Sequence, residues 1–177
     1  MIIKTFQIGK LKEIKSNFYL FYGENEGFKK KFISQITAKS ETKILRYEEN
    51  EILKNADNFY SEINNKSFFE NDKTIIISRS SDKILKIIED IVDKNLESIK
   101  VIINSKTLDK KSKLRSIFEK HKKLICIPFY EDDNLTLSKI ANNFFKNKNI
   151  PISQENINLI VERCRGDRNN LTNELSK

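Results

Sequence analysis

The segment from Gly23 to Lys29 has the composition of a loop that could bind phosphate. It reads GENEGFK and directly follows the apolar run FYLFY. A working phosphate loop, G-x-x-x-x-G-K-[ST], holds phosphates on backbone N–H groups, neutralises them with its lysine and binds Mg²⁺ through its hydroxyl. Here Gly23 and Gly27 are one residue too close, Phe28 follows the second glycine, and no Ser or Thr follows Lys29. The sequence therefore predicts a degenerate, non-functional nucleotide loop, in which two glutamates would also repel phosphate.

Nucleophilic or metal chemistry has few candidate residues. Cys126 and Cys164 are far apart, with no C-x-x-C motif or Cys/His cluster. We therefore expect no metal site, and we expect both cysteines to be core residues. The single histidine, His121, lies in the basic run KHKK, where a surface position is expected. Ser/His/Asp and Cys/His enzymes need a positioned histidine, so we expect no catalytic residue and no cofactor.

The adjacent aromatics Phe68 and Phe69 indicate a site of another kind. They lie with Ser67 in the polar segment NNKSFFEND, between the end of a predicted helix and the start of a predicted strand. One interpretation is that both rings fold under the sheet edge as core residues. Alternatively, two neighbouring side chains on a turn cannot easily both point inward, and exposed adjacent aromatics are typical of a docking site.

A basic segment extends from Lys106 to Lys123. It contains eight basic and two acidic residues, a local net charge of +6 within a chain whose net charge is +8. One interpretation is a solvated helix face. The other is contact with phosphates or DNA, since each neutralised phosphate adds affinity by counterion release. The candidate contacts are Lys110, Lys111, Lys113 and Arg115.

The apolar pattern alternates between strands and helices over residues 1 to 130. Short apolar or β-branched runs predict five strands, at 17–22, 43–47, 73–78, 98–104 and 124–128. Between them, apolar residues repeat at intervals of three and four, which predicts helices over 28–36, 52–63, 84–91 and 114–118. Ser81 or Asp82 is expected to cap the third of these helices. Continuously apolar strands are typical of parallel sheets covered on both faces, so we predict a three-layer α/β domain with a mostly parallel five-stranded sheet.

From residue 131 onward the pattern predicts a small domain of three helices. The acidic segment EDDN precedes the first, Ser153 can cap the second, and Asp167 can cap the third after Gly166 ends the second. The chain stops at Lys177, within about ten residues of the third helix start, where a helix has barely three turns. We therefore expect a fragment, or a chain without a C-terminal region.

Composition narrows the class of protein. With 38% hydrophobic residues the chain of 177 residues can build a core, although 33% of its residues are charged. Its longest aliphatic runs are far shorter than the ~18 residues that a membrane span requires, and no signal peptide precedes them. We expect a cytoplasmic protein whose basic character suits a partner with phosphates or an acidic surface.

Four landmarks in order resemble the delta subunit of the bacterial DNA polymerase III clamp loader, a relative of the AAA+ ATPases. Residues 19–26 (YLFYGENE) are similar to that family's opening "YLLxGxE" strand and its degenerate loop. Residues 67–77 resemble its "S-L-F" segment followed by R/K and a hydrophobic strand. Residues 108–114 (LDKKSKL) resemble "LDKRxKL", and residues 165–175 resemble the "GDLRxLxNELEKL" helix.

The resemblance implies an AAA+-like α/β domain at 1–130 without ATPase chemistry and a helical lid domain at 131–177. It also implies a C-terminal collar domain, through which other clamp-loader subunits would bind and which we expect to be missing from the given sequence. Phe68 and Phe69, with Ser67, would enter a pocket on the ring-shaped sliding clamp and favour its opening during DNA replication. The family is part of a DNA polymerase holoenzyme, so whether the chain counts as an enzyme stays open, although we expect no ATPase activity of its own.

Two rival functions remain at this stage. The basic segment could make the chain a nonspecific nucleic-acid-binding protein, which would bind with steep salt dependence and without need of Phe68 or Phe69. An active P-loop NTPase with an unusual loop is a third alternative, against which the spacing of the glycines already argues.

Overall fold

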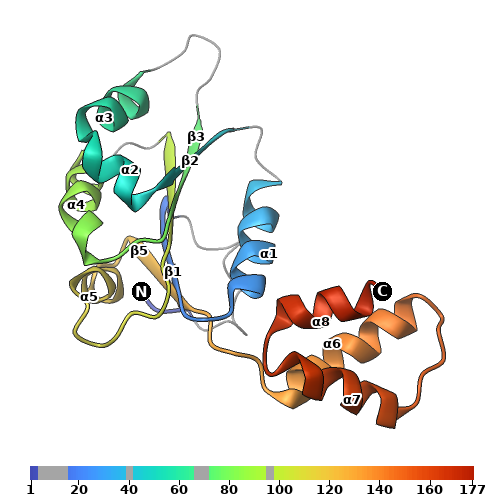
Figure 1. The fold of residues 1–177 in the computed structure, drawn as a ribbon. Coiled ribbons are helices and arrows are strands. Elements are labelled where there is room, and N and C mark those ends of the chain that lie inside the picture. Colours follow the sequence, from blue (N-terminus) through green and yellow to red (C-terminus); the bar gives the residue numbers. More distant parts are fainter. Residues whose placement is uncertain (4–15, 39–41, 66–71, 95–97) are drawn as a thin grey trace. The chain divides into compact units, whose positions relative to one another are not determined.

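The structure of the chain is a computed structural model that describes residues 1–3, 16–38, 42–65, 72–94 and 98–177 (Figure 1). Contacts divide the chain into two compact units. The first contains residues 1–23 and 33–128, and the second contains residues 24–32 and 129–177. Helix α1 (Glu26–Thr37) begins in the second unit and ends in the first. The sequence pattern does not indicate that residues 24–32 group with the helical residues.

The first unit is built on a five-stranded parallel sheet in the order β2-β3-β4-β1-β5. Its strands are β1 (Phe18–Tyr22), β2 (Lys43–Glu48), β3 (Lys73–Ser78), β4 (Ile99–Asn104) and β5 (Leu124–Pro128). Every residue of β1 and β5 is buried, whereas no residue of β2 is. The continuously apolar strands are therefore the ones with both faces covered, and the predicted parallel sheet is confirmed.

Helices α3 (Ala56–Asn64), α4 (Leu85–Asp93) and α5 (Lys113–Lys120) bury one face of this sheet. Their buried side chains share one apolar cluster with strand residues such as Leu20 and Val101. Strand residues of the opposite face, among them Ile102, are fully buried as well. The part of α1 that belongs to this unit lies on the other side of the sheet from α3 and α4 (Figure 1). The predicted three-layer α/β fold is confirmed.

The single helix expected over 52–63 is two helices. Helix α2 (Glu49–Lys54) stops at Asn55, whose φ of −145° and ψ of 66° interrupt it, and the Asn55 side chain then caps α3. Ile52, Phe59 and Ile63 are all buried in the same apolar cluster. The spacing of apolar residues therefore stays helical across the break, which hides it from the sequence.

Asp82 caps a helix other than the expected one. Ser81 caps the short 3₁₀-helix η2 (Asp82–Ile84) that leads into α4. The Asp82 carboxylate instead accepts hydrogen bonds at the start of α5. The hydroxyl of Ser112, the residue before the helix, donates at 2.6 Å, and the backbone N–H groups of the first two helical residues donate at 3.1 and 3.0 Å. Burial works to raise the pKa of Asp82, but these hydrogen bonds outweigh it and hold the pKa below its usual value.

Besides the start of α1, the second unit contains three helices, α6 (Asn134–Asn147), α7 (Gln154–Cys164) and α8 (Arg168–Leu175). Their shared core consists of Leu137, Ala141, Ile157, Val161, Cys164 and Leu171. The side chains of Asp133, Ser153 and Asp167 cap the three helices in turn. Helix α7 ends where Arg165 and Gly166 take positive φ angles of 49° and 77°, a conformation typical of a helix C-terminus.

The remaining expectations concern single residues and the membrane. Cys126 and Cys164 are free and buried, and His121 is exposed, as expected. Burial raises the pKa of the Cys126 thiol to about 12. Among the described residues, no helix has the length and apolar character needed to cross a membrane.

Candidate functional site

The degenerate nucleotide loop is held by hydrogen bonds within the protein. The backbone N–H groups of Gly23, Asn25, Glu26 and Phe28 each donate to an oxygen atom of the protein. The four donor–acceptor distances are 3.2, 3.1, 2.7 and 3.0 Å. These are the kind of groups with which a phosphate loop binds its ligand. Protein oxygens therefore occupy these four donors of the loop.

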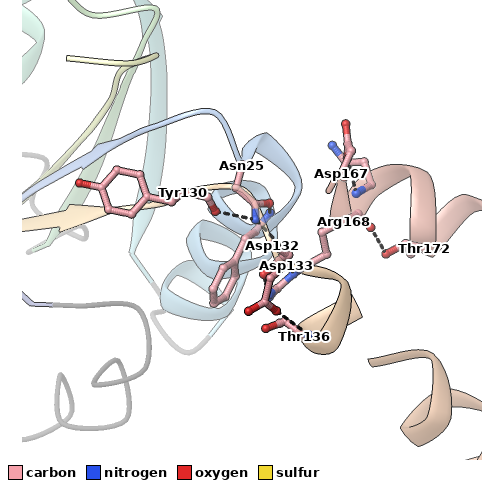
Figure 2. A network of polar contacts seen from close by, with 10 residues as sticks. Asn25, Tyr130, Asp132, Asp133, Thr136, Asp167, Arg168 and Thr172 are labelled. Atoms are coloured by element: carbon pink, nitrogen blue, oxygen red, sulfur yellow. Dashed lines mark hydrogen bonds and ion pairs between the residues drawn. The ribbon is translucent and has the colours of Figure 1, made fainter. Parts of the chain in front are cut away.

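The Asn25 side chain organises the start of α1 (Figure 2). Its Oδ1 accepts the backbone N–H of Phe28 at 3.0 Å, which caps the helix. Its Nδ2 donates to the carbonyl oxygen of Tyr130 at 3.1 Å and to Oδ2 of Asp132 at 2.9 Å. The residue is 5% exposed, and the two bonds from its Nδ2 connect the start of α1 to the segment before α6.

Arg168, the first residue of α8, binds the same carboxylate. Its Nε and Nη2 donate to the two oxygens of Asp132 at 2.7 and 2.5 Å, a paired geometry that only arginine provides (Figure 2). The guanidinium carbon also lies 3.8 Å from the centre of the Phe28 ring. The two charged side chains are 14% and 9% exposed, so this pair is largely shielded from water.

Gly27 lies directly against the start of α8. A Cβ on Gly27 would be 2.6 Å from Oδ1 of Asn169 and 2.8 Å from its backbone nitrogen. The second glycine of the loop is therefore required by the approach of the neighbouring helix. In a working phosphate loop the glycine serves the approach of phosphate instead.

Lys29 is also committed to a carboxylate. Its ammonium lies 2.7 Å from Oε1 of Glu26, one turn earlier in α1, and its side chain is fully buried. The two cations of this region, Lys29 and Arg168, are thus both paired with carboxylates of the second unit. The arrangement favours a structural role, which is to join the starts of α1 and α8 to the segment before α6.

The expected docking residues Ser67, Phe68 and Phe69 lie outside the described residues. Their flanks are described: α3 ends at Asn64, and β3 begins at Lys73. The predicted position of the segment between a helix end and a strand start therefore agrees with the elements on either side. Whether the two rings dock onto a partner stays a prediction.

The candidate phosphate contacts of the basic segment fall into two groups. Lys110, Lys111 and Lys113 are exposed at the start of α5. Arg115 is engaged within the protein, since it donates to Glu119 at 2.7 Å and to the carbonyl of Leu108 at 3.0 Å. Of the four side chains, the three lysines are thus the ones with their charge in solvent.

Sequence reasoning missed Asn25, Asp132 and Arg168 as a connected set, and it missed the buried Lys73. Asn25 carries a local signal, because an Asn just before a helical pattern is a typical N-cap. The partners of Asp132 lie more than thirty residues away on both sides, and no local pattern marks such a contact. Lys73 was assigned to a strand, and nothing in a strand pattern indicates where its ammonium binds.

No family model and no curated protein matches the sequence. Among solved structures, the clamp loader delta protein YqeN of Bacillus subtilis matches 96% of this chain with a TM-score of 0.60 at 14% identity. The Holliday junction branch migration motor RuvB of Thermotoga maritima matches 96% of it, with a TM-score of 0.59 at 14% identity. Domain III of the replication initiation protein DnaA of Thermotoga maritima matches 90%, with a TM-score of 0.50 at 13% identity.

The chain spans only part of these proteins. It covers 55% of the delta protein, 56% of RuvB and 73% of the DnaA domain. At these identities the similarity concerns the fold, and the fold is one that includes proteins of DNA replication. The chain therefore has the AAA+-like α/β fold that its sequence predicted.

Proposed function

We propose that this chain binds a ring-shaped DNA sliding clamp through Phe68 and Phe69 and favours the opened ring during clamp loading. The observation that carries the proposal is the match of 96% of the chain to the fold of a clamp loader delta protein. The adjacent aromatics lie between α3 and β3, which is also where the sequence resembles that family's clamp-binding segment. Ser67 precedes them in the same segment.

The mechanism requires differential binding and no covalent chemistry. A protein that binds the opened ring more tightly than the closed ring shifts the equilibrium by the difference between the two binding free energies. The degenerate loop supports this assignment, because four of its backbone donors and its lysine already bind protein atoms. Control by ATP would then come from other subunits, and their contacts with this chain belong to the same proposal.

The test replaces both rings and measures binding to the sliding clamp encoded in the same genome. Phe68→Ala/Phe69→Ala should weaken clamp binding about 100-fold, because apolar anchors in a desolvated pocket contribute ~2 kcal/mol or more each. The temperature at which this variant unfolds should be the same as that of the unchanged chain. The matched control is Leu135→Ala/Leu159→Ala, which removes two side chains that are 73% and 57% exposed and should leave clamp affinity intact.

Two results would contradict the proposal in different ways. Unchanged clamp affinity would remove the functional role of the two rings. A loss of ~3 to 5 kcal/mol of stability per ring would instead identify them as core residues.

Nonspecific nucleic-acid binding is the second candidate function, favoured by the three exposed lysines at the start of α5. Replacing Lys110, Lys111 and Lys113 by Gln should then weaken binding to duplex DNA and reduce its salt dependence by about 0.9 per lost phosphate contact. If this variant binds DNA as tightly as the unchanged chain, the three lysines do not form the DNA contact. Clamp binding by the same variant distinguishes the two candidates, because it should stay normal if the rings carry the contact.

A further inference from the structure

Helices α6 and α8 of the second unit lie side by side (Figure 1). A pocket of about 350 Å³ is lined by both helices and by Lys31, which lies in the part of α1 that belongs to this unit. Ligand pockets in proteins begin at ~300 Å³, so this volume is large enough for a bulky side chain of a partner. Among the described residues that line the pocket, none is acidic.

The apolar part of the lining is held in place and is only half covered. Ile140, Phe144 and Leu175 are all half-buried. Ile140 and Leu175 pack against the shared core of the three helices. The ring of Phe144 contacts the ring of Phe145, with 5.5 Å between their centres. An apolar side chain of a partner would cover the exposed part of this surface and gain affinity from the hydrophobic effect.

Two carboxamides lie beside this apolar surface. Asn143 and Asn147 are exposed and one turn apart, on the face of α6 that also carries Ile140 and Phe144. Neither side chain forms a hydrogen bond with any residue that the structure describes. A carboxamide has N–H donors and a carbonyl acceptor, as a peptide group has. The pair can therefore bind the backbone of a polypeptide that lies across the pocket.

The charges around the pocket favour an acidic partner. Lys31 is exposed, and it forms no ion pair within the described part of the chain. The ammonium of Lys148 lies 4.5 Å from the centre of the Phe144 ring and adds a second positive charge next to the lining. Glu174, on α8, already pairs with Lys177 at 2.7 Å. A partner with carboxylates would therefore be complementary to this surface.

We propose that this pocket binds a segment of a partner protein in which a bulky apolar residue is flanked by acidic residues. The apolar side chain enters the pocket, the backbone binds the two carboxamides, and a carboxylate lies near Lys31. A second copy of this chain is a poorer occupant, because each copy has a net charge of +8 and the two would repel each other. The site goes beyond the proposed function, which concerns a contact of the first unit.

The first experiment identifies what the pocket selects. The unchanged chain is used to select binders from a phage-displayed library of short random peptides, and Lys31→Glu is used in a parallel selection. Peptides enriched on the unchanged chain should share a bulky apolar residue next to Asp or Glu, and they should not be enriched on Lys31→Glu. No enrichment, or enrichment of peptides without this pattern, would overturn the proposal.

The second experiment measures the affinity of the most enriched peptide by fluorescence anisotropy. Lys31→Glu should weaken binding about fivefold or more, because repulsion replaces an exposed ion pair. Asn143→Ala/Asn147→Ala should weaken it about tenfold, because the peptide loses two hydrogen-bonding partners. All the replaced side chains are exposed, so these variants should unfold at the same temperature as the unchanged chain.

The matched control is Lys30→Glu. It makes the same change of charge at the exposed neighbour of Lys31, which does not line the pocket. This variant should alter peptide affinity by less than about twofold, because solvent and salt screen a charge that does not contact the peptide. If Lys30→Glu weakens binding as much as Lys31→Glu does, only the overall charge of the chain attracts the peptide, and the pocket is not the site.

Two further results would contradict the proposal. If a peptide with serine in place of its apolar residue binds equally well, the apolar lining has no role. If sedimentation velocity shows that the unchanged chain forms dimers and that Asn143→Ala/Asn147→Ala does not, the pocket is an interface between two copies. None of these assays contains the sliding clamp, so their outcome does not depend on the proposed function.

Discussion

Asp82 stabilises the start of α5 with a charge that acid removes. Its carboxylate accepts three hydrogen bonds there, and its pKa is lowered in the folded protein. We predict that Asp82→Ala lowers the free energy of unfolding by about 1 kcal/mol at pH 7, the usual value of a lost N-terminal cap. Urea denaturation followed by circular dichroism measures the difference.

The stability difference between the unchanged chain and Asp82→Ala should depend on pH in a defined direction. A carboxyl whose pKa is lower in the folded state stabilises the protein above its unfolded pKa, near 3.8, and this stabilisation is lost as the pH falls through the folded pKa. The difference between the unchanged chain and Asp82→Ala should therefore narrow below pH 3.8. Asp93→Ala, at the exposed end of α4, serves as the control and should show no comparable change. If the difference in unfolding free energy between the two proteins is as large at pH 3 as at pH 7, the charge of Asp82 is not the source of the stabilisation.

At the scale of elements, Arg168 and Asp132 connect α8 to the segment before α6. We predict that Arg168→Met lowers the free energy of unfolding by about 3 kcal/mol, because it leaves a carboxylate that is 9% exposed without its cation. Urea denaturation provides the measurement. The exposed Arg163 of α7 offers a matched control, and Arg163→Met should change stability by no more than about 0.5 kcal/mol.

A second variant tests the cause of that loss. Asp132→Asn/Arg168→Met removes the unpaired charge and should recover part of the stability, since the amide can still accept from Asn25. If the double variant is less stable than Arg168→Met alone, the unpaired carboxylate is not the source of the loss.

The elements show what the sequence can and cannot predict. The strands and most helices follow from local apolar spacing, because burial in this fold repeats with the period of each element. The break at Asn55 escaped prediction because Ile52 and Phe59 face the same core on either side of it. The sequence offers Ser81 or Asp82 as the cap of the nearer helix, and it does not decide between them because the partners of Asp82 lie about thirty residues away. The polar contacts of the site also join residues that are far apart in the sequence, so they could be identified only from the structure.

At the scale of the whole molecule, the degenerate loop predicts no response to nucleotide. Four of its backbone donors and Lys29 already bind protein atoms, so we expect Mg-ATP to bind with a dissociation constant weaker than about 1 mM and no hydrolysis to occur. Isothermal titration calorimetry and a phosphate-release assay measure both, with an active P-loop ATPase as the positive control. Micromolar binding of Mg-ATP would contradict this prediction and revive the enzyme alternative.

The packing around Gly27 limits which residues can replace it. Elsewhere in a helix, alanine in place of glycine is stabilising by about 1 kcal/mol, so mutation and selection would be expected to replace it readily. Here any side chain meets both the amide and the backbone of Asn169, and truncating Asn169 would relieve only half of the conflict. A library randomised at position 27 and selected for folded protein should return glycine almost alone. Recovery of alanine would mean that α8 can move away from α1 without loss of the fold. The glycine that a phosphate loop needs for its ligand is thus needed in this protein for the packing of two helices.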